Sequence, residues 1–110
     1  MKSGVYLYGG FDGTETSRSQ RDCKTSVTII SGANGRGAGV PAYHTIMAAS
    51  NTVLDGFTVR DGVANGSGMD VYAGGIYCGV SDVSIVNCLF TNNSALGGGA
   101  VFLDSSVSLS

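Results

Sequence analysis

The chain can be aligned with itself, and this internal repeat limits its fold more than any other feature. Matched positions carry apolar side chains at two spacings: Leu54 with Ile85 and Val59 with Phe90, 31 positions apart, and Val83 with Val107 and Ile85 with Leu109, 24 positions apart. A repeat of 24 residues with one insertion of seven explains both spacings, and the insertion falls in residues 63–73. Similarity at a fixed period of this length is typical of solenoids.

Apolar residues alternate over short runs within each repeat, as in 45–47, 76–78 and 100–102. This is the period of a β-strand, and no window contains a helical stripe ten residues long. The matched positions pair residues 45 and 47 with 76 and 78, and these with 100 and 102, so that equivalent side chains are expected to stack in neighbouring strands. Three such strands per repeat predict an all-β fold, a short parallel β-helix with three sides and about 24 residues per coil.

Length and turn chemistry define the predicted organisation. We expect residues 1–110 to form a single domain, either complete and self-associating or a piece of a longer solenoid, with surface loops at 9–24 and 63–73.

Matched turn residues predict the corners of the coil. Gly56 matches Asn87, and Gly62 matches Asn93. Because Gly and Asn enter the left-handed backbone region at low cost, each pair predicts a corner. A capping-box spacing from residue 17 to residue 20 predicts one helical turn over 18–21.

Composition narrows the classes of function. The formal net charge is −2, charged residues make up 13%, and the six Lys and Arg residues are scattered, so the sequence predicts no nucleic-acid partner. The first residues lead directly into a strand-like run and no long apolar stretch follows, which predicts neither a signal peptide nor membrane insertion. These features leave the compartment undetermined.

Several short motifs resemble a known group of proteins. The starts Gly74-Gly75-Ile76 and Gly98-Gly99-Ala100-Val101, together with Phe90-Thr91-Asn92-Asn93, look like the GGA[ILV] and FxxN repeats of chlamydial polymorphic outer membrane proteins. The segments YGGFDGTETSRSQRD (8–22) and VLDGFTVRDG (53–62) are similar to bacterial right-handed β-helix repeat proteins of the pectin-lyase-like superfamily. The resemblance implies a right-handed coil on secreted or surface-exposed proteins, in adhesin-type or polysaccharide-related settings.

The same superfamily includes polysaccharide lyases and glycoside hydrolases, which require clustered carboxylates. Asp55, Arg60 and Asp61 are the nearest approach to such a cluster, and we expect them around one corner. Their matches one repeat later are Val86, Thr91 and Asn92, so no acidic row continues along the face and a solvated turn with a local ion pair is favoured. We therefore predict no catalytic residues.

The metal-ligating residue types are few. Three cysteines cannot form a complete set of intramolecular disulfides, and Cys78 and Cys88 match apolar positions and are expected in the core. His44 is the single histidine and is expected at the surface. The sequence therefore predicts neither a metal site nor a cofactor.

One predicted face suggests contacts. If residues 45, 47, 76 and 78 point inward, then Ile46, Tyr77, Val101 and Leu103 form an apolar row on the outside. Exposed apolar rows mark covered or contacted surfaces, so we expect either the loop over 10–23 or a second molecule to cover it. The prediction is thus a non-catalytic module that binds surfaces, glycans or proteins and forms homo-oligomers through its ends or this face. The alternative is a polysaccharide lyase or glycoside hydrolase.

Overall fold

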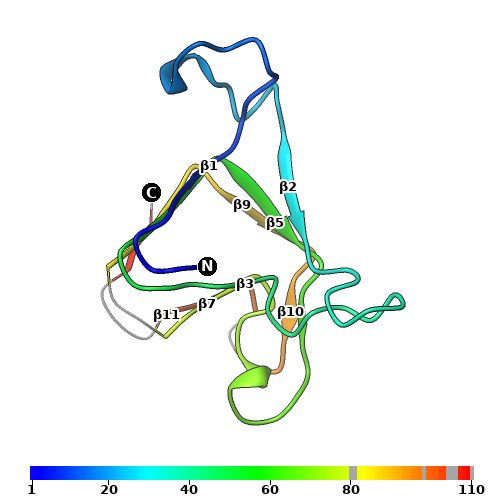
Figure 1. Ribbon diagram of the computed structural model, residues 1–110. Coiled ribbons are helices and arrows are strands. Elements are labelled where there is room, and N and C mark those ends of the chain that lie inside the picture. Colours follow the sequence, from blue (N-terminus) through cyan, green and yellow to red (C-terminus); the bar gives the residue numbers. More distant parts are fainter. Residues whose placement is uncertain (80–81, 98, 104–106, 110) are drawn as a thin grey trace.

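The protein folds into parallel β-strands connected by turns and long loops (Figure 1). A computed structural model describes residues 1–79, 82–97, 99–103 and 107–109. The strands are β1 (Tyr6–Tyr8), β2 (Thr28–Ser31), β3 (Ile46–Met47), β4 (Thr52–Asp55), β5 (Phe57–Arg60), β6 (Val63–Ala64), β7 (Ile76–Cys78), β8 (Val83–Val86), β9 (Leu89–Thr91), β10 (Ser94–Ala95), β11 (Val101–Leu103) and β12 (Val107–Leu109). Two short 3₁₀ helices are η1 (Arg18–Gln20) and η2 (Gly68–Val71). The prediction of a helical turn after residue 17 is confirmed by η1.

The strands belong to four separate small sheets. Their orders are β1-β4-β8-β12, β11-β7-β3, β2-β5-β9 and β10-β6, and every pairing is parallel. The all-β prediction holds, but the predicted short right-handed β-helix, with three sides and about 24 residues per coil, is wrong. Paired residues are between 24 positions apart, as for Val83 and Val107, and 47 apart, as for Tyr6 and Val53. Within the part of the chain that the structure describes, no strand exceeds four residues.

Left-handed residues explain why the strands are so short. Asn51, Asp61, Asn87 and Asn92 have φ angles between 51° and 67°, and Gly56 has φ 86°. Each of them lies at a strand end and turns the chain sharply, so the strands on either side enter different sheets. The corner predicted at Gly56 and Asn87 is confirmed. The other predicted corner is displaced by one residue, since Asp61 and Asn92, and not their neighbours, hold the left-handed backbone.

The register agrees with the sequence in some strands and not in others. Leu54 lies opposite Ile85 and Val59 opposite Phe90, as predicted. In the β11-β7-β3 sheet, however, Ile46 pairs with Ile76, and Ile76 pairs with Val101. This register differs by one residue from the predicted one, and such a shift moves a side chain to the opposite face of the sheet.

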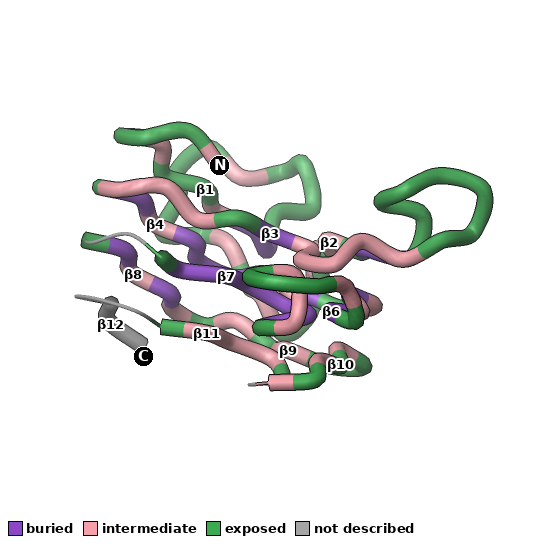
Figure 2. Tube along the Cα trace, turned by 90° about the horizontal axis from the view of Figure 1, so that it is seen from below, coloured by how far each residue is buried: buried purple, intermediate pink, exposed green. Residues whose placement is uncertain are grey.

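Three of the sheets share one apolar core (Figure 2). Its buried members come from β3, β4, β5, β7 and β8: Ile46, Leu54, Val59, Ile76, Cys78, Val83 and Ile85. Leu54, Val59 and Ile76 are fully buried. The core lies inside the outline that the three sheets trace in Figure 1, while long excursions project from it, residues 9–26 at the top, 32–45 at the right and 65–72 at the bottom.

Candidate functional site

One concave site lies under the upper excursion, residues 9–26, which we call the apex loop (Figure 1). Here a cleft of about 760 Å³ separates the returning end of the loop from the first residues of β5 and β9. We call it the apex cleft. Its lining combines charged, polar and apolar residues: Arg21, Asp22, Cys23, Lys24, Val27, Gly56, Phe57, Thr58, Asn87, Cys88 and Leu89.

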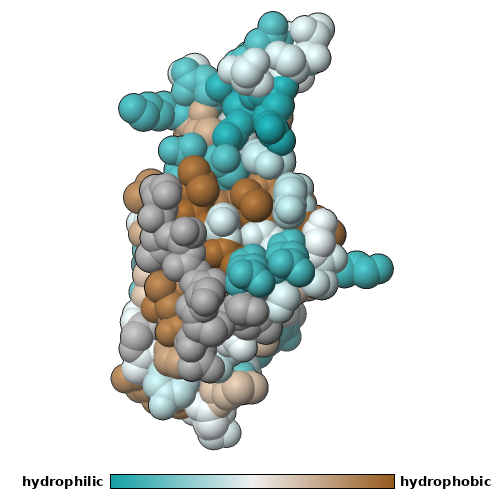
Figure 3. Space-filling view, turned by 90° about the vertical axis from the view of Figure 1, so that its left-hand side faces the viewer, coloured by the Kyte–Doolittle hydropathy of each residue, from teal (hydrophilic) through white to brown (hydrophobic). Residues whose placement is uncertain are grey.

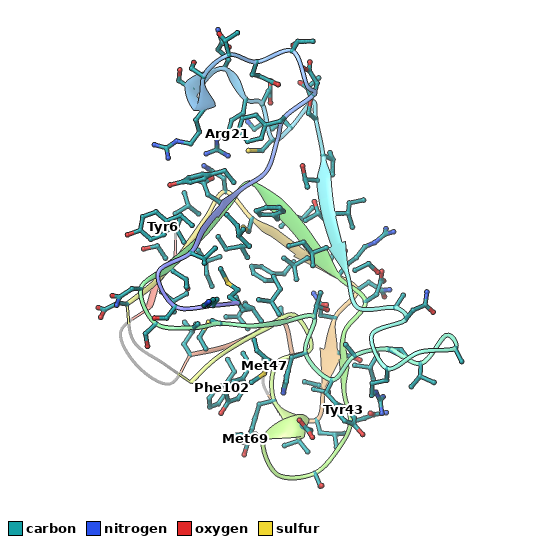
Figure 4. All side chains as sticks on the ribbon, in the orientation of Figure 1. Tyr6, Arg21, Tyr43, Met47, Met69 and Phe102 are labelled. Atoms are coloured by element: carbon teal, nitrogen blue, oxygen red, sulfur yellow. The ribbon has the colours of Figure 1, made fainter. Side chains whose placement is uncertain are left out.

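A largely buried ion pair holds the apex loop to the sheets. The Arg21 Nη2 atom lies 2.8 Å from Asp55 Oδ1, and the two side chains are only 15% and 12% exposed. Arg21 also donates to the carbonyl oxygen of Gly9 at 3.1 Å, and its guanidinium lies 5.4 Å from the centre of the Tyr8 ring. The hydrogen bond with Asp55 raises the pKa of Arg21. Figure 4 places Arg21 between the loop and the sheets, where it fixes one wall of the cleft.

The loop's return to the sheet is set by one aspartate. Asp22 Oδ1 accepts hydrogen bonds from the backbone N–H groups of Lys24 and Thr25, at 2.9 and 3.2 Å. These bonds lower the pKa of Asp22. The turn leaves the side chains of Lys24 and Val27 exposed along the cleft, so that a cation and an aliphatic group face the same space.

The three thiols have different environments. Cys78 is fully buried, as predicted, and burial raises its pKa to about 11. Cys88 packs against the core and also lines the apex cleft, and burial raises its pKa. Cys23 is partly exposed in the same cleft, and its sulfur accepts a hydrogen bond from Arg21 Nη1 at 3.2 Å. All three cysteines are free thiols.

Asp61 occupies a different corner. Its carboxylate accepts hydrogen bonds from Ser31 Oγ and Asn92 Nδ2, both at 2.7 Å, and lies 3.0 Å from Arg60 Nε. The bonds from Asn92 and Ser31 lower the pKa of Asp61. Asp61 also lines a smaller cleft of about 460 Å³ together with Asn92 and Asn93.

The structure therefore separates the predicted acidic corner. Asp55 ends β4 just before β5, whereas Arg60 ends β5 and Asp61 follows it. Each carboxylate is hydrogen bonded to its own neighbours, Asp55 to Arg21 and Asn87, and Asp61 to Ser31 and Asn92. Asp55 therefore lies apart from the other two residues, because β5 runs between the two carboxylates, whereas Arg60 and Asp61 form a local ion pair of the kind that the sequence favoured. Both carboxylates serve to hold strands and loops together.

The predicted outer apolar row is also divided. Tyr77 does belong to the outer face, between Met47 and Phe102 in the register. Ile46 is in the core at 7% exposure, and Val101 packs against the same core, so both predictions were wrong because of the register difference. Leu103 pairs with Cys78, whose side chain is fully buried, yet Leu103 itself is 41% exposed.

Aromatic rings form a continuous row on this outer face. Tyr77 stacks on Phe102 with ring centres 5.0 Å apart and planes 7° apart, and His44 and Tyr72 extend the row at 5.1 and 5.0 Å. We call these four residues the aromatic row. The loop over 10–23, which was one of the two predicted covers, lies at the opposite end of the molecule and does not cover the row (Figure 1). The His44 side chain is only 6% exposed, so its prediction as a surface residue was also wrong.

Sequence reasoning missed the apex cleft, although two signals for it are present. Asp22 precedes Lys24 and Thr25 at the spacing of an Asx turn, which reverses the chain toward the sheet. The matched corners at Gly56 and Asn87 place the beginnings of β5 and β9 side by side. What the sequence did not indicate is the long-range pair between Arg21 and Asp55 that closes the loop over them.

Comparisons with known proteins do not show to which family the chain belongs. No protein-family model, no curated protein and no solved structure matches the chain. The resemblance to pectin-lyase-like and polymorphic outer membrane proteins therefore stays a prediction. Within the described residues, no helix has the length and apolar character needed to cross a membrane, and no group of three or more His, Cys, Asp or Glu side chains could hold a metal ion.

Proposed function

We propose that this chain is a binding module that takes an extended glycan in the apex cleft, without catalysing a reaction. The observation that carries the proposal is the composition and form of that cleft, about 760 Å³ with exposed aliphatic side chains beside cationic and amide groups. Ligand sites combine an apolar surface with a few polar groups that fix orientation. Sugars present the matching chemistry, C–H faces and hydroxyl groups.

Specific residues of the cleft suit such a ligand. Leu89 is 61% and Val27 57% exposed, which gives an aliphatic floor. Thr58 and Asn87 supply hydroxyl and amide hydrogen-bonding groups from two neighbouring strands or their turns. Lys24 adds a cation. The Asp22 carboxylate also lines the cleft, but it accepts hydrogen bonds from the backbone of Lys24 and Thr25 and from the Thr25 hydroxyl, so Lys24 is the charge left for a ligand and acidic sugars such as uronic acids are the favoured class.

The enzymatic alternative, a polysaccharide lyase or glycoside hydrolase, is less well supported. Its candidate carboxylates, Asp55 and Asp61, flank the two ends of β5 and each is engaged by its own hydrogen bonds. Hydrolysis needs two carboxyl groups facing one bond. A binding site requires only the surface that the cleft already presents.

Binding is tested by titrating pectin-derived and other acidic oligosaccharides into the ¹⁵N-labelled protein and following amide shifts. We expect shifts at residues 21–27 and at the starts of β5 and β9. Lys24→Ala and Leu89→Ser should each weaken binding about tenfold, which corresponds to one or two lost contacts, while the control Lys2→Ala should not. Absence of glycan binding, or equal binding by the cleft variants, would contradict the proposal.

The same samples separate the alternatives. Incubation with polyuronates, with and without Ca²⁺, while following unsaturated products and reducing ends, should show no turnover. Turnover would replace the binding proposal with the enzymatic one. Binding of peptides but not glycans at the same amides would assign the cleft to a protein ligand.

We further propose that the module self-associates through the outer face of the β11-β7-β3 sheet. Tyr72 of the aromatic row is 39% exposed, and three further apolar side chains from β3 and from the segments that flank the row are exposed as well: Met47 at 48%, Met69 at 60% and Leu96 at 74%. Exposed apolar side chains that gather on one face mark protein contacts. The labelled positions of Met47, Phe102 and Met69 in Figure 4 lie along the same side of the molecule.

A further inference from the structure

The outer face of the β2-β5-β9 sheet connects two clefts. The apex cleft opens at the first residues of β5 and β9, and its lining includes Val27, Thr58 and Leu89. The smaller cleft of about 460 Å³ opens at the other end of the same strands, where Asp61 directly follows β5 and Asn92 directly follows β9. In Figure 1 the apex loop lies at the upper end of these strands and residues 32–45 lie at their lower end. The strands therefore run from one cleft to the other.

The alternation of side chains determines which residues this face presents. Val59 is fully buried, and its partners in the register, Ile30 and Phe90, pack against the core. The residues on either side of them in each strand therefore face outward. These residues form two rows across the sheet, an upper row of Ile29, Thr58 and Leu89 and a lower row of Ser31, Arg60 and Thr91.

Both rows are accessible and each continues into a cleft. The exposed fractions are 47% for Ile29 and 46% for the Arg60 side chain. The upper row belongs in part to the apex cleft, because Thr58 and Leu89 line it. The lower row meets the smaller cleft through Ser31 Oγ, which donates a hydrogen bond of 2.7 Å to Asp61. The two clefts and the sheet face between them thus form one continuous surface.

The lower row supplies a cation for a ligand. The Asp61 carboxylate already accepts hydrogen bonds from Ser31 and Asn92 and lies 3.0 Å from Arg60 Nε. A guanidinium has five N–H donors, and four of them are on its two Nη atoms. Arg60 can therefore bind an acidic group through its Nη atoms while Nε stays on Asp61. The far end of the face then offers a cation beside hydroxyl and aliphatic groups, as the apex cleft does with Lys24.

We propose that one acidic glycan chain occupies both clefts by crossing the outer face of the β2-β5-β9 sheet along its strands. This inference rests on the proposed function, which assigns the apex cleft to a glycan. The upper row contacts the C–H faces of the sugars, and Arg60 binds a sugar carboxylate near the smaller cleft. Because β5 contains four residues, the path is about 13 Å long, which requires a run of several sugars.

Oligomers of galacturonic acid of two lengths test this path. The dimer and the hexamer are titrated into the ¹⁵N-labelled full chain, and the amide shifts give both the affinity and the contacted residues. We expect the dimer to shift amides around the apex cleft alone. The hexamer should also shift the amides of residues 60–61 and 91–92, and it should bind about tenfold more tightly because it makes additional contacts.

Two substitutions on the face, outside the apex cleft, test its contribution to binding. Arg60→Gln and Ile29→Ser should each weaken hexamer binding about tenfold and change dimer binding by less than about twofold. Arg18→Gln is the matched control, because it removes the same charge from an exposed arginine that lies over the Tyr8 ring, beside a different sheet. It should leave the binding of both oligomers unchanged. Urea unfolding of each sample checks that the fold is retained.

The outcomes separate this inference from the function on which it rests. Equal affinity for the dimer and the hexamer, or equal losses for both oligomers in Arg60→Gln, would overturn the continuous path and leave a glycan site in the apex cleft. Binding of neither oligomer would overturn the path and the proposed function together. Tighter binding of hexaglutamate than of the hexamer would assign the path to an acidic peptide and overturn the glycan assignment.

Discussion

Single residues in this protein are constrained by close approaches that a sequence shows only indirectly. Gly62 is buried, and a Cβ atom there would collide with the carbonyl oxygen of Gly74. That carbonyl accepts the backbone hydrogen bond of Thr45 at 3.0 Å, so it cannot move away without loss. The matching of Gly62 with Asn93 indicated a special position. Its cause is crowding, since the left-handed backbone belongs to Asp61.

We expect Gly62→Ala to lower the free energy of unfolding by about 3 kcal/mol, as overpacking against rigid backbone does. Gly99→Ala is the matched control, because no atom of the described residues lies within 4 Å of the corresponding Cβ position. Its effect should stay within about 0.5 kcal/mol. Urea denaturation followed by circular dichroism measures both. Equal stabilities for the two variants would show that the approach of Gly62 to Gly74 is not rigid.

The Asp61 corner makes a pH-dependent contribution whose sign follows from its contacts. Hydrogen bonds from Asn92 and Ser31 hold the pKa of Asp61 below its ordinary value of 3.8. The ionised form is therefore favoured by folding, and its stabilisation is present above the ordinary value and lost as pH falls through the lowered one. Ser31→Ala removes one of the two donors. We expect the pKa of Asp61 to rise and acid unfolding to begin at a higher pH.

Carbon-detected NMR of the carboxyl groups measures this change. Asp12 serves as an internal control, because its pKa is lowered by hydrogen bonds with Thr14 and not by the Asp61 corner. A rise at Asp61 with no change at Asp12 is the expected result. An unchanged Asp61 would mean that the hydrogen bond from Ser31 contributes nothing to the carboxylate in solution.

At the level of elements, the register of a strand could be predicted only where the alternate residues that face one side of the sheet are clearly more apolar than those that face the other side. In β4 and β8, Leu54 and Ile85 alternate with more polar or less buried neighbours, and their pairing was predicted correctly. In β3 and β7, adjacent residues such as Ile46 and Met47 are both apolar. The alternation then does not indicate which of the two residues faces the core, and a shift of one residue in the register exchanges their faces.

A pair of substitutions tests which face each residue occupies. Ile46 is 7% exposed and Met47 is 48% exposed. We expect Ile46→Ala to cost about 2–4 kcal/mol of unfolding free energy, because it leaves a cavity in the core. Met47→Ala should cost less than about 1 kcal/mol. The reverse order, measured by urea denaturation, would support the face assignment predicted from the sequence.

For the whole molecule, the arrangement of the sheets and the apex cleft depend on loop lengths and on long-range residue pairs, and the sequence did not indicate either. The matched spacings led to a regular coil, but the chain inserts excursions of different lengths between its strands, and its parallel pairings fall into four separate sheets. The closure of the apex loop rests on Arg21 meeting Asp55, which lies 34 positions away in the sequence. Neither residue carries a local signal for the other, so the apex cleft could not be predicted.

The last prediction concerns self-association of the chain through the outer face of the β11-β7-β3 sheet. If Met47, Met69 and Tyr72 contact a second copy, sedimentation equilibrium should give a mass above the 11.1 kDa of one chain, rising with concentration. Met69→Lys should return the mass toward that of one chain, because an ammonium group in an apolar contact is strongly unfavourable. Met69 is 60% exposed, so the change leaves the folded monomer intact.

Tyr6 provides the matched control, because it is 59% exposed but belongs to β1 in a different sheet. Figure 3 views that side of the molecule, where hydrophobic surface lies below the hydrophilic apex loop. Tyr6→Lys should leave the association unchanged if the β11-β7-β3 face forms the contact. If Tyr6→Lys dissociates the protein and Met69→Lys does not, the contact lies on the β1 side. A single-chain mass at every concentration would exclude self-association through either face.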